Sequence, residues 1–165
     1  TATLIMMLLF TTAFAASPSF RTQTLTALVE MFDDHSEIRF SGTTNGAETH
    51  KMSILWMPDG YQIGLEEFDE SRMIIRADGE NGENLDVAAT AISKNRSYSF
   101  DTEGAIEESA MVQNNEAGVY QMKTEKGDKI TVLWTDMEKG WIVKVTGYNI
   151  SKEDMLRISE SVEIR

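Results

Sequence analysis

Carboxylates are the most abundant side chains in this sequence that could do chemistry. They gather in three runs: Glu66, Glu67, Asp69 and Glu70; Asp78, Glu80 and Asp86; and Glu103, Glu107 and Glu108. A carboxylate-dependent hydrolase of the glycosidase type needs one buried acid and a second carboxylate about 5–10 Å away. Acidic runs in a chain of net charge −12 are typical of solvated faces instead. The runs therefore favour a non-catalytic protein, and a secreted hydrolase is the last-ranked hypothesis.

Histidine, cysteine and metal chemistry are equally sparse. The only imidazoles are His35 and His50. The stretch "DDHSE" (33–37) could bind a metal, but no second histidine lies at ligand spacing, which favours a polar connector. We expect His50 to be an exposed spacer. The stretch "DGENGENLD" (78–86) offers oxygen donors for calcium, but Glu83 stands where an EF-hand needs glycine, so a hairpin turn is expected. The chain has no cysteine, which excludes thiolate zinc sites and a cysteine nucleophile. Taken together, these observations predict no catalytic residue, no metal and no cofactor.

An apolar binding surface is the remaining chemical possibility. The residues that could line it are Trp56, Trp134, Trp141, Met52, Met57, Met73, Met111 and Met122. Most such residues belong to a core, although methionine adapts well to apolar ligands. We predict a ligand groove beside the sheet with Trp56 and Tyr61 at its rim. The net charge makes nucleic acid a poor partner.

Residues 1–20 indicate the cellular location of the protein. Residues 1–20 carry no charge, and the run is just long enough to cross a membrane. Ala13-Phe14-Ala15 also fits a signal-peptidase site, so a transmembrane anchor and a signal peptide both remain open. Either one places the following residues outside the cytoplasm. We predict an anchor or signal segment over 1–20, an amphipathic juxtamembrane helix over 21–36 and an α+β domain over 37–165.

That amphipathic helix is predicted from apolar residues at helical spacing. They are Leu25, Leu28, Val29 and Phe32, at positions i, i+3, i+4 and i+7. From Glu37 onward the period becomes alternating, which predicts strands. The strand-like stretches are 37–42, the two runs flanking Pro58-Asp59-Gly60, and then 72–77, 85–93 and 105–112.

The strand pairing of two further hairpins can be predicted by counting residues from the loop. A three-residue loop Glu125-Lys126-Gly127 would pair Met122 with Ile130 and Tyr120 with Val132. Pairing Trp134 with Trp141 would place Val132 opposite Val143 and Ile130 opposite Val145. One apolar face would then cross three strands. The opposite face, predicted to be solvated, would carry Gln121, Lys123, Thr131, Lys144 and Thr146.

A sheet with one apolar face needs a cover, and the C-terminal stretch "VTGYNISKEDMLRISESVEI" (145–164) supplies it. Ser151 is predicted as the N-cap, with Asp154 completing a capping box and Ile150 packing onto Met155. Met155, Ile158 and Val162 form the apolar stripe that should dock on the sheet. The predicted fold class is α+β: an antiparallel sheet with one face covered by a C-terminal helix, preceded by an N-terminal hydrophobic helix.

Three motifs carry a family resemblance. "LWMPDGYQIG" resembles a Y-x-P-x-G-Y/F element, "ITVLWTD" an L-x-W-S/T-D strand, and "VTGYNISKEDMLRISESV" a G-x-I/L-S-K-E-E-L-x-x-I-A-E-S ending. With the hydrophobic segment before "EMFDDHSEIRF", they resemble a Firmicutes domain-of-unknown-function family. Ser159 departs from the usual alanine, which should loosen packing of the last helix.

Members of this family are typically the extracytoplasmic C-terminal part of membrane-anchored proteins, often with an anti-sigma-factor-like cytoplasmic portion. The resemblance implies a non-catalytic sensor or binding domain of a membrane-anchored regulatory protein. Its partners would be an extracytoplasmic ligand, the membrane through residues 1–20, and a sigma factor through a cytoplasmic part upstream. The alternative is a secreted carrier of an apolar ligand, a lipid or a peptide.

Overall fold

The computed structural model describes residues 28–31, 35–39, 50–93 and 97–165. The described strands belong to two compact units. One unit contains β1 (Leu28–Met31), β2 (His35–Arg39) and β7 (Ser97–Asp101), and the other contains all remaining elements. The predicted anchor or signal segment over 1–20 lies outside the described residues. No helix in the described ranges is long and apolar enough to cross a membrane.

The smaller unit is an antiparallel sheet in the order β1-β2-β7. The predicted helix is wrong at Leu28–Met31, which is a strand paired with β2 from Leu28 opposite Arg39 to Met31 opposite Ser36. The helical spacing rested on only four apolar positions, two of which fall in this strand. Valine, which is β-branched, favours a strand where a neighbouring strand can satisfy the backbone.

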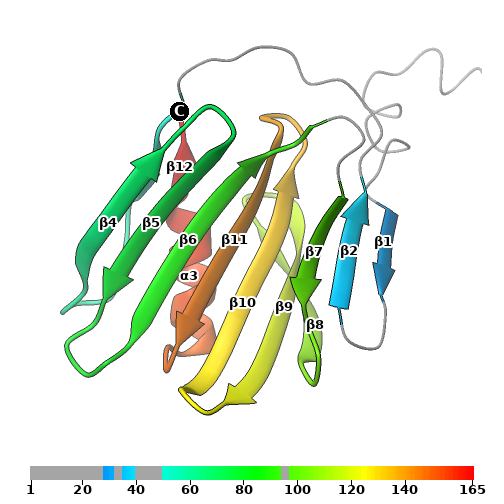
Figure 1. The fold of residues 1–165 in the computed structure, drawn as a ribbon. Helices are drawn as coiled ribbons and strands as arrows, with labels where there is room; N and C mark the ends of the chain where they lie inside the picture. Colours follow the sequence, from blue (N-terminus) through cyan, green and yellow to red (C-terminus); the bar gives the residue numbers. More distant parts are fainter. Residues whose placement is uncertain (1–27, 32–34, 40–49, 94–96) are drawn as a thin grey trace, which may run out of the picture. The chain divides into compact units, whose positions relative to one another are not determined.

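The larger unit is built on a seven-stranded antiparallel sheet in the order β4-β5-β6-β11-β10-β9-β8 (Figure 1). The strands are β4 (Gln62–Phe68), β5 (Arg72–Asp78), β6 (Asn84–Ala91), β8 (Ile106–Val112), β9 (Asn115–Thr124), β10 (Gly127–Asp136) and β11 (Trp141–Tyr148). Two meanders therefore meet at the β6–β11 pair. The strands predicted over 72–77, 85–93 and 105–112 are confirmed.

One face of this sheet, called the core face, carries the hydrophobic core. Its buried side chains include Met73, Ile75, Val87, Val119, Val132, Trp134, Trp141, Val143 and Val145. Helix α3 (Lys152–Ser161) covers this face together with a ribbon of β3 (Met52–Ile54) and β12 (Val162–Ile164) (Figure 1). The predicted architecture, an antiparallel sheet with a C-terminal helix on one face, is confirmed.

The N-cap of α3 is as predicted, whereas the Asp154 carboxylate bonds the Ser151 hydroxyl and not the Ser151 backbone amide of a capping box. Ser151 is the N-cap: its hydroxyl accepts a hydrogen bond from the Asp154 amide at 3.1 Å and donates one to the Asp154 carboxylate at 2.7 Å. Ile150 and Met155 are both buried in the core, where a hydrophobic staple would place them. The end differs from the prediction, because Val162 leaves the helix and opens β12, which pairs with β3.

Docking of α3 requires a gap in the sheet surface. Met155 and Ile158 are fully buried under the helix, and Gly147 of β11 lies beneath Met155. A Cβ at Gly147 would overlap the Met155 sulfur and the Ile150 side chain. Glycine here lets the helix approach the sheet closely. Ser159 is also buried, and its hydroxyl donates to the Met155 carbonyl at 2.8 Å, so this polar group is satisfied within the helix.

The β10–β11 register differs from the predicted one by two residues. Trp134 lies opposite Val143, and Trp141 lies opposite Asp136. The connection is longer than the one assumed, because Asp136 accepts a hydrogen bond from the Lys139 amide and holds the turn within it. An even shift preserves the faces, so both indoles lie on the core face as predicted.

The β9–β10 register is wrong by one residue, and this shift exchanges the faces of β9. Gly127 pairs with Thr124 across a two-residue turn, so Val119 lies opposite Val132, and Tyr120 lies opposite Thr131. Val119 and Ala117 therefore enter the core, whereas Tyr120 and Met122 point to the other face. Gln121 and Lys123 move to the core face for the same reason.

The second face of the sheet is only partly the solvated surface that was predicted. Thr131 and Thr146 share a hydroxyl hydrogen bond there, and Arg76 forms an ion pair with Asp86 at 2.7 Å. The same face also carries apolar side chains that are buried, namely Ile74, Ala88, Leu133 and Ile142, with Tyr120 beside them. This face is therefore mixed in character.

The tip of the β8–β9 hairpin fixes the far end of α3. Gln113 and Asn114 have positive φ values of 50° and 63°, as a tight two-residue turn requires. The Gln113 amide donates to the carbonyls of Ser159, Glu160 and Val162, which lie at the end of the helix. A residue distant in sequence thus adds a donor to the carbonyls at the helix end, of which that of Ser159 also accepts the Val162 amide.

Ile158→Ala should lower the free energy of unfolding by about 2–4 kcal/mol, because it leaves a cavity between α3 and the sheet. Glu153→Ala, on the exposed side of the same helix, should cost less than about 1 kcal/mol. Urea unfolding followed by tryptophan fluorescence measures both. Equal effects would contradict the docking of Ile158.

Gln113→Asn should lower the free energy of unfolding by about 1–3 kcal/mol. Asparagine tolerates the positive φ, but its side chain is one methylene too short to reach the helix carbonyls. Gln121→Asn, the same change at a glutamine whose amide bonds the half-exposed Glu108 carboxylate, is the control and should cost less than about 1 kcal/mol. Both are measured by urea unfolding, and a Gln113 variant as stable as the control would disprove the non-local cap.

Candidate functional site

A groove of about 590 Å³ lies on the core face of the large sheet, beside the start of α3. Its lining comes from β8, β9, β10, the turn before β8 and the residues that open the helix. The lining residues are Gly104, Ile106, Gln121, Met122, Lys123, Asp128, Lys129, Ile130, Ile150, Ser151 and Lys152. All of them belong to the larger unit.

The groove exists because α3 begins short of the sheet's end. Asn149 has φ of 60° and turns the chain from β11 towards the helix. Its amide donates to the Asp128 carbonyl at 2.8 Å, and its side-chain oxygen accepts from the Asp128 amide at 3.2 Å. A Cβ at Gly127 would overlap the Asn149 side chain, so glycine there permits this docking. The last rows of the core face are left without helical cover.

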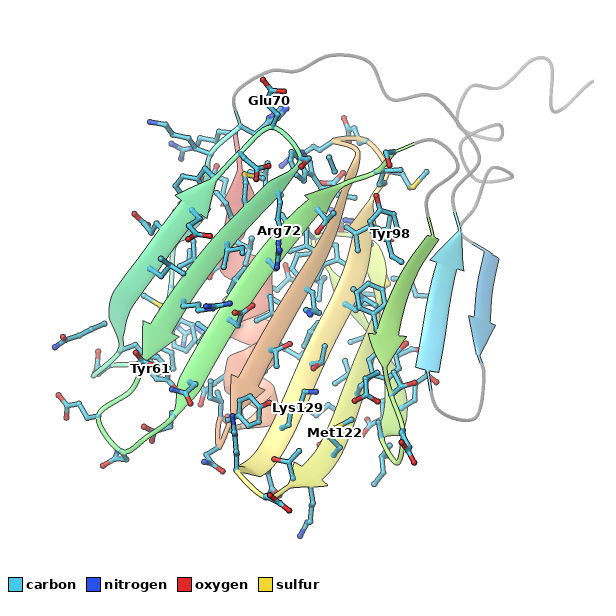
Figure 2. The ribbon with its side chains drawn as sticks, viewed as in Figure 1. Tyr61, Glu70, Arg72, Tyr98, Met122 and Lys129 are labelled. Atoms are coloured by element: carbon cyan, nitrogen blue, oxygen red, sulfur yellow. The ribbon has the colours of Figure 1, made fainter. Side chains whose placement is uncertain are left out.

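Strand alternation decides which side chains face the groove. Ile106, Gln121 and Ile130 form one row across β8, β9 and β10, and Lys123 and Asp128 form part of the next. Met122 and Lys129 pair with each other between these rows, so their side chains point to the second face (Figure 2). The one-residue register shift is thus what brings Gln121 and Lys123 into the site.

The apolar part of the groove is aliphatic. Ile130 and Ile150 are each 7% exposed and form its floor beside the core, whereas Ile106 is 68% exposed at the sheet edge. One exposed isoleucine and two buried ones thus line the same groove, and an apolar group bound there could cover them.

Glu108 connects the groove wall to the helix. Its carboxylate forms an ion pair with the Lys152 ammonium and accepts a hydrogen bond from the Gln121 amide at 2.8 Å. The hydrogen bond from Lys152 and its charge hold the pKa of Glu108 below its usual value. This arrangement fixes Lys152 at the start of α3 and leaves Glu108 ionised at neutral pH.

Lys123 and Asp128 are the two charged residues that face the groove and remain uncommitted. They lie directly opposite each other on β9 and β10, and both are exposed. Within the described residues, neither the Lys123 ammonium nor the Asp128 carboxylate forms an ion pair or a hydrogen bond. The groove therefore presents one free cation and one free anion side by side above an aliphatic floor.

The predicted rim residues lie elsewhere. Trp56 packs against the core with the Arg157 guanidinium 3.9 Å from its ring centroid, and its carbonyl accepts a hydrogen bond from Ser161. Tyr61 also packs against the core; burial, with Glu83 and Asp154 nearby, raises the pKa of its phenol. Neither residue lines the groove described here. They were selected by residue type, whereas the groove depends on Ile106, which the sequence analysis did not name, and on Ile130 and Ile150, which it assigned to the core.

Two other candidates for chemistry, His50 and the 78–86 stretch, take part in the fold. His50 is not the exposed spacer that was predicted, because it is half-buried and packs edge-on against Trp141 with centroids 5.4 Å apart. The 78–86 stretch is a hairpin turn, as expected, closed by the Gly79 amide on the Glu83 carbonyl. Asp33 and Asp34 of the 33–37 cluster lie outside the described residues. Elsewhere in the described ranges, no group of three or more metal-ligating side chains was found.

The acidic runs are tied to turns. Asp69 accepts hydrogen bonds from the amides of Ser71 and Arg72, which lower its pKa. The pKa of Glu83 is lowered in the same way by its own amide and that of Asn81. These carboxylates stabilise hairpin connections, and their lowered pKa values keep them ionised.

Comparison with known proteins gives one finding. A family model described as a domain of unknown function (DUF4367) matches residues 51–162. The match includes the whole large sheet, α3 and every residue that lines the groove. Searches of curated proteins and of solved structures returned no match.

The Glu108–Lys152 contact predicts a defined pH dependence. Because the folded pKa of Glu108 lies below 4.5, its contribution is fully present above that pH and is lost as the pH falls through the folded value. Glu108→Gln should lower the melting temperature at pH 7, and the difference from the unsubstituted chain should shrink towards pH 3.

Thermal melts between pH 3 and pH 7 measure this difference. Glu107→Gln makes the same change on the neighbouring residue, which points to the other face, and it should leave the melting temperature nearly unchanged. A difference for Glu108→Gln that grows on acidification would contradict the assignment.

Proposed function

The chain belongs to the DUF4367 family of domains of unknown function, and from this premise we propose that it is a non-catalytic sensor or binding domain. Its ligand occupies the groove beside the start of α3. The domain works outside the cytoplasm as part of a membrane-anchored regulatory protein of the anti-sigma-factor type.

The groove is the observation that carries this proposal. Its volume of about 590 Å³ lies within the range of small-molecule sites, which is roughly 300–1,000 Å³. Such sites combine apolar walls with a few polar groups that orient the ligand. Three isoleucines and the uncommitted charges of Lys123 and Asp128 provide both parts.

The state of the carboxylates supports binding over catalysis. A general acid working near neutral pH needs a raised pKa. The carboxyl groups of Asp69, Glu83 and Glu108 have lowered pKa values instead, and each is bonded to a turn amide or to Lys152. These side chains act in the fold, so we assign them no reaction.

The chain path supports a sensing role. Helix α3 borders the groove with Ser151 and Lys152 and continues directly into β12. At the end of β12, the Arg165 and Lys51 backbones exchange two hydrogen bonds of 2.8 and 3.0 Å. Lys51 lies directly before β3, at the start of the described part of this unit. A change in the position of α3 on ligand binding would therefore reach the segment that precedes the domain.

The upstream residues provide the rest of the proposed setting. The uncharged segment 1–20 anchors the protein in the membrane, and a cytoplasmic part before it binds a sigma factor. A secreted carrier of an apolar ligand is the second candidate, because the same groove would serve it. The residues that precede Thr1 in the gene distinguish the two: a cytoplasmic domain favours the sensor, and a short basic start favours the carrier.

Small-molecule capture tests the binding function without assuming a ligand. The immobilised full chain is exposed to an extract of the cell envelope and growth medium of its source organism, and bound compounds are identified by mass spectrometry. We expect a compound that the unsubstituted chain retains and that Ile106→Asn loses, because a buried amide in the aliphatic groove costs binding energy.

Met111→Asn is the matched control, since Met111 is 61% exposed on the same strand but outside the groove. It should retain the compound. A compound lost equally by both variants, or no retained compound at all, would contradict a binding role for this groove.

A further inference from the structure

We infer that the groove binds a zwitterion with an aliphatic body: a ligand that carries a free ammonium and a free carboxylate, as amino acids and short peptides do. This inference rests on the proposed function and specifies the chemistry of its ligand. The uncommitted Lys123 and Asp128 side chains above the isoleucine floor carry it.

The pair of Lys123 and Asp128 indicates which charges the ligand carries. Residues directly opposite on antiparallel strands have Cβ atoms about 4.5–5.5 Å apart. Lys123 and Asp128 occupy such positions and still form no ion pair with each other. A ligand with both charges close together can satisfy the two side chains at once, its carboxylate at Lys123 and its ammonium at Asp128.

The balance of charge argues against a purely anionic or cationic ligand. Of the charged residues in the groove lining, Lys129 points to the second face and Lys152 is paired with Glu108, so that Lys123 and Asp128 remain, one of each sign. The chain as a whole has a net charge of −12, so a neutral groove contrasts with its surface. An anion would meet Asp128 and a cation would meet Lys123, whereas a zwitterion complements both.

The start of α3 favours placing the carboxylate on this side of the groove. Ser151 accepts the Asp154 amide, and the Met155 amide bonds to the Ser151 carbonyl. The amides of Lys152 and Glu153, by contrast, have no hydrogen-bond acceptor among the described residues. First-turn amides of this kind interact well with negative charge, and Lys152 lies beside them in the lining.

The aliphatic floor selects the body of the ligand. Ile106 is 68% exposed, while Ile130, two strands away in the same row, and Ile150 are nearly buried. An aliphatic side chain placed against them would cover Ile106. Since each buried methylene raises affinity about fourfold, leucine-sized side chains should bind far better than alanine-sized ones.

Chemical-shift titration of the ¹⁵N-labelled full chain tests this inference. The probes are trileucine, its N-acetyl form, its C-terminal amide, trialanine and free leucine. We expect trileucine to shift the amides of Lys123, Asp128, Ile130 and Lys152. Each capped form should bind about threefold to fivefold more weakly, the usual range for one exposed ion pair. Trialanine should bind at least about tenfold more weakly.

Free leucine distinguishes the two sources of this chemistry. If it binds as well as trileucine, a single amino acid is the ligand; if it binds much more weakly, a short peptide is. Capped and free trileucine binding equally well would overturn the inference, as would titrations in which no probe shifts the groove amides.

Matching each protein charge to its ligand charge sharpens the test. Lys123→Gln should weaken free trileucine about threefold to fivefold but leave the C-terminal amide unaffected, because the partner charge is already missing. Asp128→Asn should likewise weaken the binding of free trileucine about threefold to fivefold. It should leave the binding of the N-acetyl form unaffected, because the ammonium that Asp128 would contact is already missing. Lys126→Gln, in the adjacent turn but outside the groove, is the control and should change neither affinity. A control variant that behaves like Lys123→Gln would overturn the assignment.

Failure of this inference and failure of the proposed function are distinguishable. A captured compound lost by Ile106→Asn but carrying no paired charges would refute the zwitterion and leave the binding domain intact. Capture with no Ile106-dependent compound would refute the binding domain itself.

Discussion

The structure depends on how one apolar sheet face is covered, because the single helix that packs on it is narrower than the sheet. Seven strands about 4.8 Å apart make a sheet about 29 Å wide, whereas a helix with its side chains is about 10 Å across. α3 alone therefore covers part of the core face, and the β3–β12 ribbon covers another part. Close approach at Gly147 lets Met155 and Ile158 fill the space beneath the helix. What remains uncovered, beyond the start of α3, is the groove.

The same contacts that hold α3 in place also shape the site. Glu108 fixes Lys152 at the start of the helix, and Gln113 bonds the carbonyls at its end, so the β8–β9 hairpin holds the helix at two points. Asn149 locks the preceding turn against Gly127. A ligand seated against Ile150 and Lys152 would therefore press on a helix whose position is set by a few polar contacts. This is how a binding event could be passed to β12 and Lys51.

Local features were predictable from the sequence, and features decided by distant residues were not. The Ser151 cap and the Ile150–Met155 staple depend on neighbouring residues, and both were predicted. The predicted β9–β10 register was wrong because the turn at Gly127 is set by Asn149, more than twenty residues later. That single shift hid Lys123 from the site. Ile106 was missed since nothing local indicates that its strand becomes a sheet edge next to the start of a helix.

Hydrogen–deuterium exchange of the full chain most directly tests whether the docking of α3 closes the core. The backbone amides of Met155 to Ser161 should exchange with the same opening free energy as those of Val132 and Val143, since helix and sheet share one core. Helix amides that exchange far faster while the β10 and β11 amides stay protected would contradict this account. The helix would then be a loosely attached cover, and a groove defined by its first residues would not persist.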